Sequence, residues 1–197
     1  NAIRLAYAQR LQAVFRALMH QNMTAALQAG SRALVYCVQA QAWDRLGGFA
    51  SGVVTSTSDP RLLEGLIPHL RTAAESAPEG EPRWSCLCYL ADALRKGGRP
   101  DVSLPFYEQA AAQARAAASG TALAVVSGTA LAAGVSPASD VASPAASAVP
   151  LSSASTQAWA DLAWITGNWA NALYMTGDLD TARQRQLESA EAHKKAG

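Results

Sequence analysis

The side chains that could carry out metal or acid–base chemistry begin with three histidines. His20, His69 and His193 are far apart in the sequence and fall in or beside different expected helices. A metal or catalytic cluster would require the fold to bring them together. We interpret all three as surface or helix-end residues, since His20 and His193 fall near helix C-termini, where the helix dipole favours a cation.

Three cysteines, Cys37, Cys86 and Cys88, could bind metal or act as nucleophiles. Cys86 and Cys88 are two positions apart, which on a helix separates their side chains by about 200°. They therefore cannot chelate one ion together, and we interpret the cysteines as core thiols. A low, odd number of cysteines forms no disulfide framework and favours a reducing compartment, from which we expect a cytoplasmic location.

Nucleotide chemistry is not indicated by the glycines. Gly47 and Gly48 fall inside an expected helix and do not follow a strand, so they form no phosphate loop. No pair of carboxylates stands in a recognisable catalytic frame. The net charge of +1 gives no case for nucleic acid or an anionic membrane. We therefore expect no catalytic site, cofactor or metal in this chain, and neither a nucleic acid nor a membrane as partner.

Apolar residues recur at helical spacing through most of the chain, and this pattern predicts an all-α protein. Asp59 and Pro60 form a good helix start, with an N-cap followed by proline at the first helical position. Trp159, Trp164 and Trp169 step by five residues, so they surround their helix and are expected in the core. The expected helices cover residues 3–20, 24–40, 42–54, 60–75, 82–96, 101–118, 157–176 and 179–194.

A spaced pattern recurs around two turn glycines, Gly98 and Gly177. The residues at matching offsets are Leu90, Ala91, Leu94, Ser103, Tyr107 and Ala110 around Gly98, and Trp169, Ala170, Leu173, Ala182, Gln186 and Ser189 around Gly177. Ala26, Gly30 and Ala33 follow Gln21 at the same offsets. Small residues at these places predict close helix crossings. A helical hairpin of this kind cannot bury its apolar face alone, so the pattern predicts stacked hairpins.

These spacings resemble the tetratricopeptide repeat (TPR). Trp43, Leu46, Gly47 and Ala50 have the spacing of the first helix of such a repeat, and residues 89–110 and 168–182 look like the bodies of two further repeats. The resemblance covers most of the chain outside residues 119–154. It implies an α-solenoid of stacked antiparallel helical hairpins, a TPR-like superhelix, in which Gly65 would be the close-packing residue of the second hairpin.

The resemblance also implies a partner site on the concave face of the superhelix. Asn168 and Asn171 share a helix face, and inward asparagines in this family can hold an extended peptide. The same alignment places Asp44, Arg45, Cys88, Asp92, Arg95 and Tyr174 in the groove. Helix solubility or interhelical hydrogen bonds explain the two asparagines almost as well. The full carboxylate-clamp pattern of chaperone-binding members is absent, because the matching positions of the first hairpin are apolar.

Residues 119–154 separate two helical parts, residues 1–118 and 155–197. Between residues 116 and 160 the only charged side chain is Asp140, and the sequence Ser-Gly-Thr-Ala-Leu-Ala occurs twice. A Ser/Ala/Gly/Pro tract with few large apolar groups offsets its ordering entropy poorly. This composition predicts a flexible insertion. Because the chain begins with Asn1 and stops just after a helix, we expect it to be a fragment of a longer protein.

The leading functional hypothesis is a protein–protein interaction scaffold that binds a protein or peptide ligand on its concave face and has no catalysis of its own. The alternative is a regulatory or sensor arm of a larger multidomain signalling ATPase or protease. A nucleotide or protease motif beyond either end of the chain would favour the alternative. A stand-alone enzyme has almost no support in the sequence.

Overall fold

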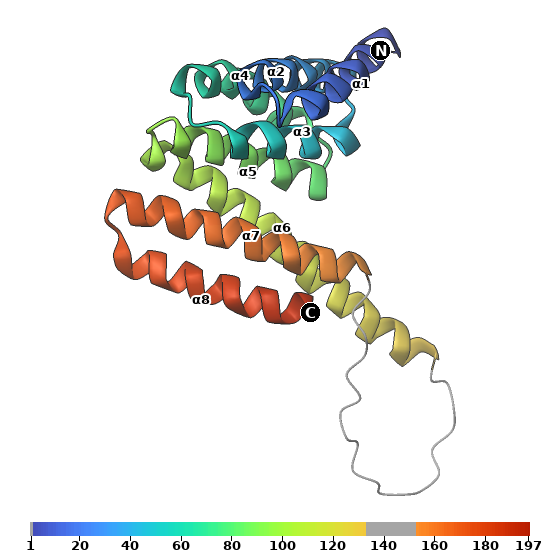
Figure 1. The fold of residues 1–197 in the computed structure, drawn as a ribbon. Helices are drawn as coiled ribbons and strands as arrows, with labels where there is room; N and C mark the ends of the chain where they lie inside the picture. The colour runs from blue at the N-terminus through green and yellow to red at the C-terminus, as the bar shows by residue number, and fades with distance from the viewer. Residues whose placement is uncertain (1, 133–152) are drawn as a thin grey trace, which may run out of the picture.

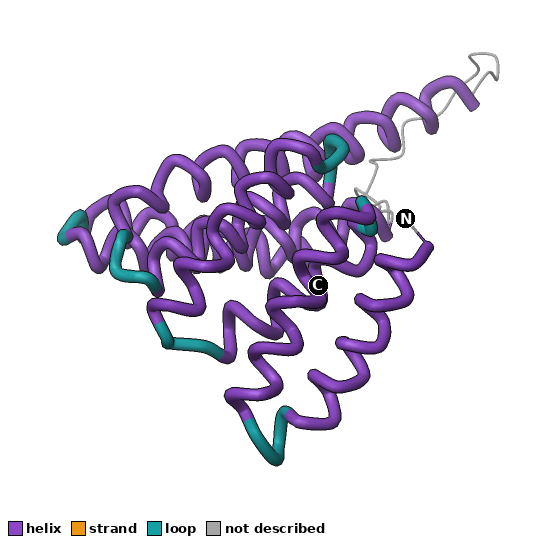
Figure 2. Tube along the Cα trace, turned by 90° about the horizontal axis from the view of Figure 1, so that it is seen from above, coloured by secondary structure: helices purple, strands orange, loops and turns teal. Residues whose placement is uncertain are grey.

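The protein is all-helical in the part that its computed structural model describes, residues 2–132 and 153–197. Eight helices cover this part, and neither view shows a strand within it (Figures 1 and 2). The helices are α1 (Ala2–Leu18), α2 (Met23–Ala40), α3 (Trp43–Ser56), α4 (Pro60–Ser76), α5 (Glu81–Lys96), α6 (Pro100–Ala132), α7 (Ser153–Thr176) and α8 (Leu179–Ala196). The all-α prediction is confirmed.

The helices are stacked from α1 and α2 at one end to α7 and α8 at the other (Figure 1). The pairs α1/α2, α5/α6 and α7/α8 pack along their lengths, and α6 packs on α7. The consecutive helices α3 and α4 do not pair in this way. Both contact α2 and α5 instead, so the second hairpin differs from the packed antiparallel pair that the sequence predicts.

The linker between α3 and α4 explains this difference. Thr57 follows α3 in an extended conformation, with φ of −107° and ψ of 144°, so the chain does not reverse in a tight turn. Lys96, at the end of α5, donates from Nζ to the carbonyls of Val54, Thr55 and Thr57 at 2.7, 2.8 and 3.3 Å. The end of α5 is thereby bound to the end of α3.

Three other connections are tight turns with one hydrogen-bond pattern. Gly98 and Gly177 have φ of 83° and 88°, in the left-handed region that favours glycine, as the turn signals predict. Gln41 occupies the same region with φ of 56°. The closing bonds run from Ala42 N to Cys37 O, from Arg99 N to Leu94 O and from Asp178 N to Leu173 O, at 2.9 to 3.1 Å.

Among the described glycines, the closest approach of helices is at Gly30. A Cβ atom added there would lie 2.5 Å from Val53 Cγ2 and 2.9 Å from Phe15 Cδ2. A Cβ atom added at Gly47 or Gly65 would meet nothing within 4 Å. The prediction of close packing at Gly65 is therefore wrong, and Gly47 likewise lies at no close crossing, because α3 and α4 lack the pairing that would cover them.

The small residues around the two turn glycines are buried as predicted. Ser103 and Ala110 have no exposed surface, and Ala182 and Ser189 are at most 8 % exposed. Ser189 Oγ donates to the carbonyl of Ala163 at 2.7 Å, which joins α8 to α7. The equivalence fails at one large position, where Tyr107 is buried and Gln186 is exposed.

Helix α6 is longer than the sequence predicts, since it continues past residue 118 to Ala132. Alanine and leucine are strong helix formers, and no proline follows Pro105 until Pro137. The expected insertion, residues 119–154, therefore overlaps α6 and the start of α7. Residues 133–152 lie outside the described residues, and their flexibility stays a prediction.

Candidate functional site

Two of the predicted partner-binding residues face the interior. Cys88 has no exposed surface, and Asp92 is 3 % exposed. Asp92 Oδ1 accepts hydrogen bonds from Tyr107 Oη at 2.5 Å and from Arg95 Nη2 at 3.0 Å. Arg95 Nε also donates to Tyr107 Oη at 3.2 Å. Asp92, Arg95 and Tyr107 thus form a polar network between α5 and α6, in which Asp92 and Tyr107 are buried and Arg95 is half-buried. Cys88 and Asp92 therefore cannot contact a partner in this structure.

The buried environment keeps Tyr107 and the neighbouring Cys88 neutral. Burial, reinforced by the charge of Asp92, raises the pKa of Tyr107 far above its ordinary value. Burial also raises the pKa of Cys88 well above that of a free thiol. At neutral pH Tyr107 is therefore a neutral hydrogen-bond donor and Cys88 an unreactive thiol. The network is suited to holding two helices together.

The remaining predicted residues lie on helices that do not pack against each other. Asp44 and Arg45 are on α3 and form an ion pair at 3.7 Å. Asn168, Asn171 and Tyr174 are on α7, where Asn168 is half-buried, Asn171 is exposed and Tyr174 is 70 % exposed. Helix α5 contacts both α3 and α7. The structure therefore brings Cys88, Asp92 and Arg95 together on α5 and leaves the α3 and α7 residues as separate groups.

The cysteines are core thiols, as predicted. Cys37, Cys86 and Cys88 are free and buried. Burial raises the pKa of Cys37 to about 11 and that of Cys86 to about 12. No group of three metal-ligating side chains comes together within residues 2–132 and 153–197.

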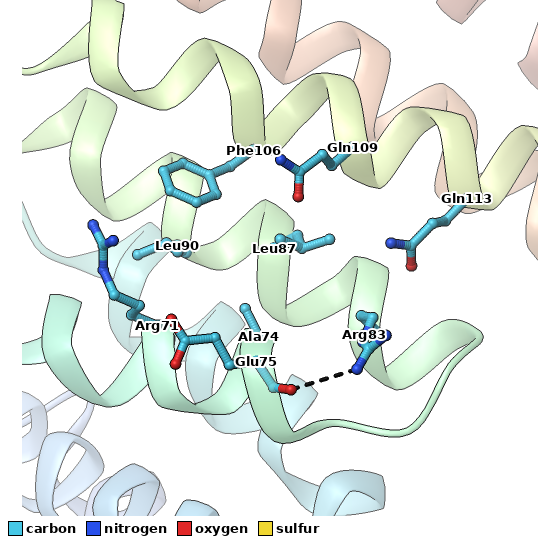
Figure 3. A pocket seen from close by; sticks show the side chains of 9 residues that line it. All are labelled: Arg71, Ala74, Glu75, Arg83, Leu87, Leu90, Phe106, Gln109 and Gln113. Carbon is cyan, nitrogen blue, oxygen red and sulfur yellow. Dashed lines mark hydrogen bonds between the residues drawn. The ribbon is translucent and has the colours of Figure 1, made fainter.

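A groove crosses the surface where α4, α5 and α6 meet (Figure 3). We call it the α4–α6 groove, and it encloses about 340 Å³. Leu87 and Leu90 of α5 form an apolar floor. Helix α4 provides one wall and α6 the other. The wall residues are Arg71, Ala74 and Glu75 on α4, and Phe106, Gln109 and Gln113 on α6.

Both walls present polar groups above the apolar floor. Gln109 and Gln113 are one turn apart on α6, and both side chains extend toward the groove (Figure 3). Each amide can donate and accept hydrogen bonds. On the opposite wall, the Arg71 guanidinium lies 5.7 Å from the centroid of the Phe106 ring. Among the described residues, Arg71 has no ion pair with a carboxylate.

Arg83 fixes the end of the wall that α4 forms. Its Nε atom donates to the carbonyl of Ala77 at 3.1 Å, and its Nη2 atom donates to the carbonyl of Glu75 at 3.4 Å. Past Arg83 a second cleft continues, lined by Glu79, Gly80, Arg83, Trp84, Gln113, Ala116 and Ala117. The two clefts share Arg83 and Gln113. Together they follow α6 from Phe106 to Ala117, about 16 Å at 1.5 Å per residue.

Sequence reasoning missed this groove. A signal was present, because Gln109 and Gln113 are polar residues at one-turn spacing in an alanine-rich segment that follows Phe106. That spacing shows that the two amides share a helix face. It does not show that α4 lies opposite that face.

The comparisons with known proteins identify no family. No protein-family model, curated protein or solved structure matches this chain. Within the described ranges, every helix lacks the combination of length and apolar character that a membrane span requires.

Proposed function

We propose that this protein is an interaction scaffold of stacked helical hairpins, a TPR-like α-solenoid, that binds an extended peptide segment of a partner protein in the α4–α6 groove. The observation that carries this proposal is the placement of Gln109 and Gln113 over an apolar floor (Figure 3). This site replaces the set on α3, α5 and α7 that the resemblance implies, two members of which are buried.

The spacing of the two amides suits a peptide backbone. Gln109 and Gln113 are four positions apart on α6, which separates them by about 6.0 Å along the helix axis at 1.5 Å per residue. Groups on the same side of an extended peptide repeat every two residues, about 6.6 Å. Flexible glutamine side chains can bridge this difference, so Gln109 and Gln113 can each bond a backbone amide on one edge of the ligand. The α4–α6 groove and the second cleft together, about 16 Å along α6, accommodate about five extended residues.

The floor and the opposite wall supply side-chain selectivity. Leu87, which is 6 % exposed, offers a small apolar surface to a side chain of the ligand, and Leu90 is buried beside it. The Arg71 guanidinium, stacked near Phe106, can pair with a carboxylate at the ligand's other edge. Amide and guanidinium groups do not exchange protons at neutral pH. These amide and guanidinium groups therefore support binding of a ligand without a chemical reaction.

The test is selection from a displayed library of random peptides, followed by binding measurements on purified variants. The double variant Gln109→Ala, Gln113→Ala should bind the selected peptides at least about tenfold more weakly, since two backbone contacts are lost. The matched control is Gln184→Ala, Gln186→Ala, which removes two exposed glutamines from α8. Equal affinity of the two double variants, or failure to select any peptide, would contradict the proposal.

A further inference from the structure

A second groove lies between α2 and α4, apart from the α4–α6 groove. We call it the α2–α4 groove, and it encloses about 270 Å³. Leu66 is buried in its base, and Val35 and Leu62 are half-buried at its sides. The other lining residues are Gln28, Ser31, Arg32, Arg61, Gly65 and His69. No residue lines both grooves.

Gly65 leaves the middle of the α2–α4 groove open. A Cβ atom built on Gly65 would meet nothing within 4 Å, so no side chain of the described residues fills this space. Leu62 and Leu66 flank Gly65 on the same helix and are one turn apart. The result is an open apolar depression between Leu62 and Leu66 that an aliphatic side chain could enter.

The rim of this depression carries cationic side chains that lack carboxylate partners. Arg32 and Arg61 are exposed, and neither forms an ion pair with a described residue. The nearest acidic residues along α4 are engaged elsewhere. Asp59 caps α4 by accepting from the backbone N–H of Arg61, and Glu64 pairs with Arg99 at 3.4 Å.

The end of the stack that includes this groove is basic. Residues 1–76, which include α1 to α4, contain seven arginines and four acidic residues, which gives a charge of +3. The chain as a whole is +1, so residues 77–197 carry −2. A charge asymmetry of this kind attracts negatively charged ligands toward one end of the protein.

We infer that the α2–α4 groove binds an acidic segment of a partner protein, with an aliphatic side chain over Gly65 and carboxylates on Arg32 and Arg61. This surface is additional to the proposed function and does not depend on it. An apolar depression between two cations matches a peptide that combines leucine-like and acidic side chains. Nucleic acid and membrane surfaces fit less well, because binding to them rests on many cationic contacts along a phosphate array.

The experiment measures fluorescence anisotropy with a short labelled peptide that combines glutamates and leucines. Two control peptides carry lysine for each glutamate or alanine for each leucine. The acidic, leucine-containing peptide should bind, both controls should bind at least about tenfold more weakly, and added salt should weaken binding. Equal binding of the lysine peptide or of the alanine peptide would overturn the inference.

Protein variants locate the binding on the protein. Gly65→Leu should weaken binding of the acidic peptide by about tenfold or more, because the new side chain fills the depression. Its matched control is Gly48→Leu, another helical glycine whose added Cβ atom meets nothing. Arg32→Gln and Arg61→Gln should each weaken binding more than Arg10→Gln, which removes the same charge from α1.

The variants also distinguish binding in the α2–α4 groove from binding elsewhere on the protein. Gln109→Ala, Gln113→Ala should bind the acidic peptide as the natural sequence does, so this result is independent of the α4–α6 groove. Equal effects of Gly65→Leu and Gly48→Leu would overturn the inference. The inference would also be overturned if single-stranded DNA or anionic vesicles displaced the peptide at concentrations at which an acidic protein segment does not displace it.

Discussion

Tyr107 donates a hydrogen bond from its hydroxyl to the Asp92 carboxylate, and this contact joins α6 to α5 where both side chains are buried. Arg95 completes the network by donating to both partners. From the resemblance to TPR proteins, Asp92 and Arg95 are expected to contact a ligand. The structure gives them a role in holding the third helical hairpin together.

Removing the Tyr107 hydroxyl should destabilise the protein. Tyr107→Phe leaves the Asp92 carboxylate with one donor fewer in a buried site, so we expect the free energy of unfolding to fall by about 1–3 kcal/mol. Tyr174→Phe is the control, because Tyr174 is 70 % exposed, and should change stability by less than about 0.5 kcal/mol. Urea unfolding measures both, and equal stabilities would show that the network contributes nothing.

The turn at Gln41 should be improved by glycine. A residue other than glycine in the left-handed region is strained by about 1–2 kcal/mol, and glycine's greater unfolded-state entropy offsets part of the gain. Gln41→Gly should therefore stabilise the protein by up to about 1 kcal/mol, whereas Gly98→Ala should destabilise it by about 1 kcal/mol or more. Thermal unfolding of both variants tests this, and a lower melting temperature for Gln41→Gly would contradict the turn geometry.

Two helical glycines should respond oppositely to alanine. Gly30→Ala places a Cβ atom 2.5 Å from Val53 Cγ2 and should cost about 1–3 kcal/mol in unfolding free energy. Gly47→Ala meets no atom within 4 Å and should gain about 0.5–1 kcal/mol, because alanine is the better helix former. Chemical denaturation compares the two. Destabilisation by Gly47→Ala would restore it as a crossing point.

The thiols should be unreactive at mild pH. The pKa of Cys37 is raised to about 11 and that of Cys86 to about 12 by burial, so little thiolate exists at pH 8. Iodoacetamide should modify the folded protein slowly at pH 8 and all three cysteines rapidly in urea. The folded-state pKa values of Cys37 and Cys86 exceed the ordinary thiol pKa of 9.0. The stability that these buried neutral thiols contribute is therefore complete below pH 9 and is lost as the pH rises toward 11–12. Rapid labelling of the folded protein would contradict the burial.

The sequence predicts helices and turns well because the signals are local. The glycines at positions 98 and 177 mark turns by their own conformational preference, and Ser103 and Ala182 mark crossings by their size. All of these features depend on residues within one hairpin. A periodic pattern is sufficient to find them.

The sequence does not predict contacts that depend on distant helices. Lys96 bonds to carbonyls about forty positions earlier in the chain, and this contact accompanies the loss of pairing between α3 and α4. The burial of Asp92 depends on a tyrosine fifteen positions away. The α4–α6 groove likewise exists because α4 lies across α5 from Gln109 and Gln113. None of these placements follows from spacing along one helix.

The most direct test of the proposed function is an NMR titration with a selected peptide. The methyl signals of Leu87 and Leu90 report the floor of the α4–α6 groove, and the side-chain amide signal of Asn171, which is exposed on α7, reports the competing surface. Binding in the groove should shift the signals of Leu87 and Leu90 and leave that of Asn171 unchanged. A shift at Asn171 with Leu87 and Leu90 unchanged would place the ligand on the α7 surface and contradict the proposal.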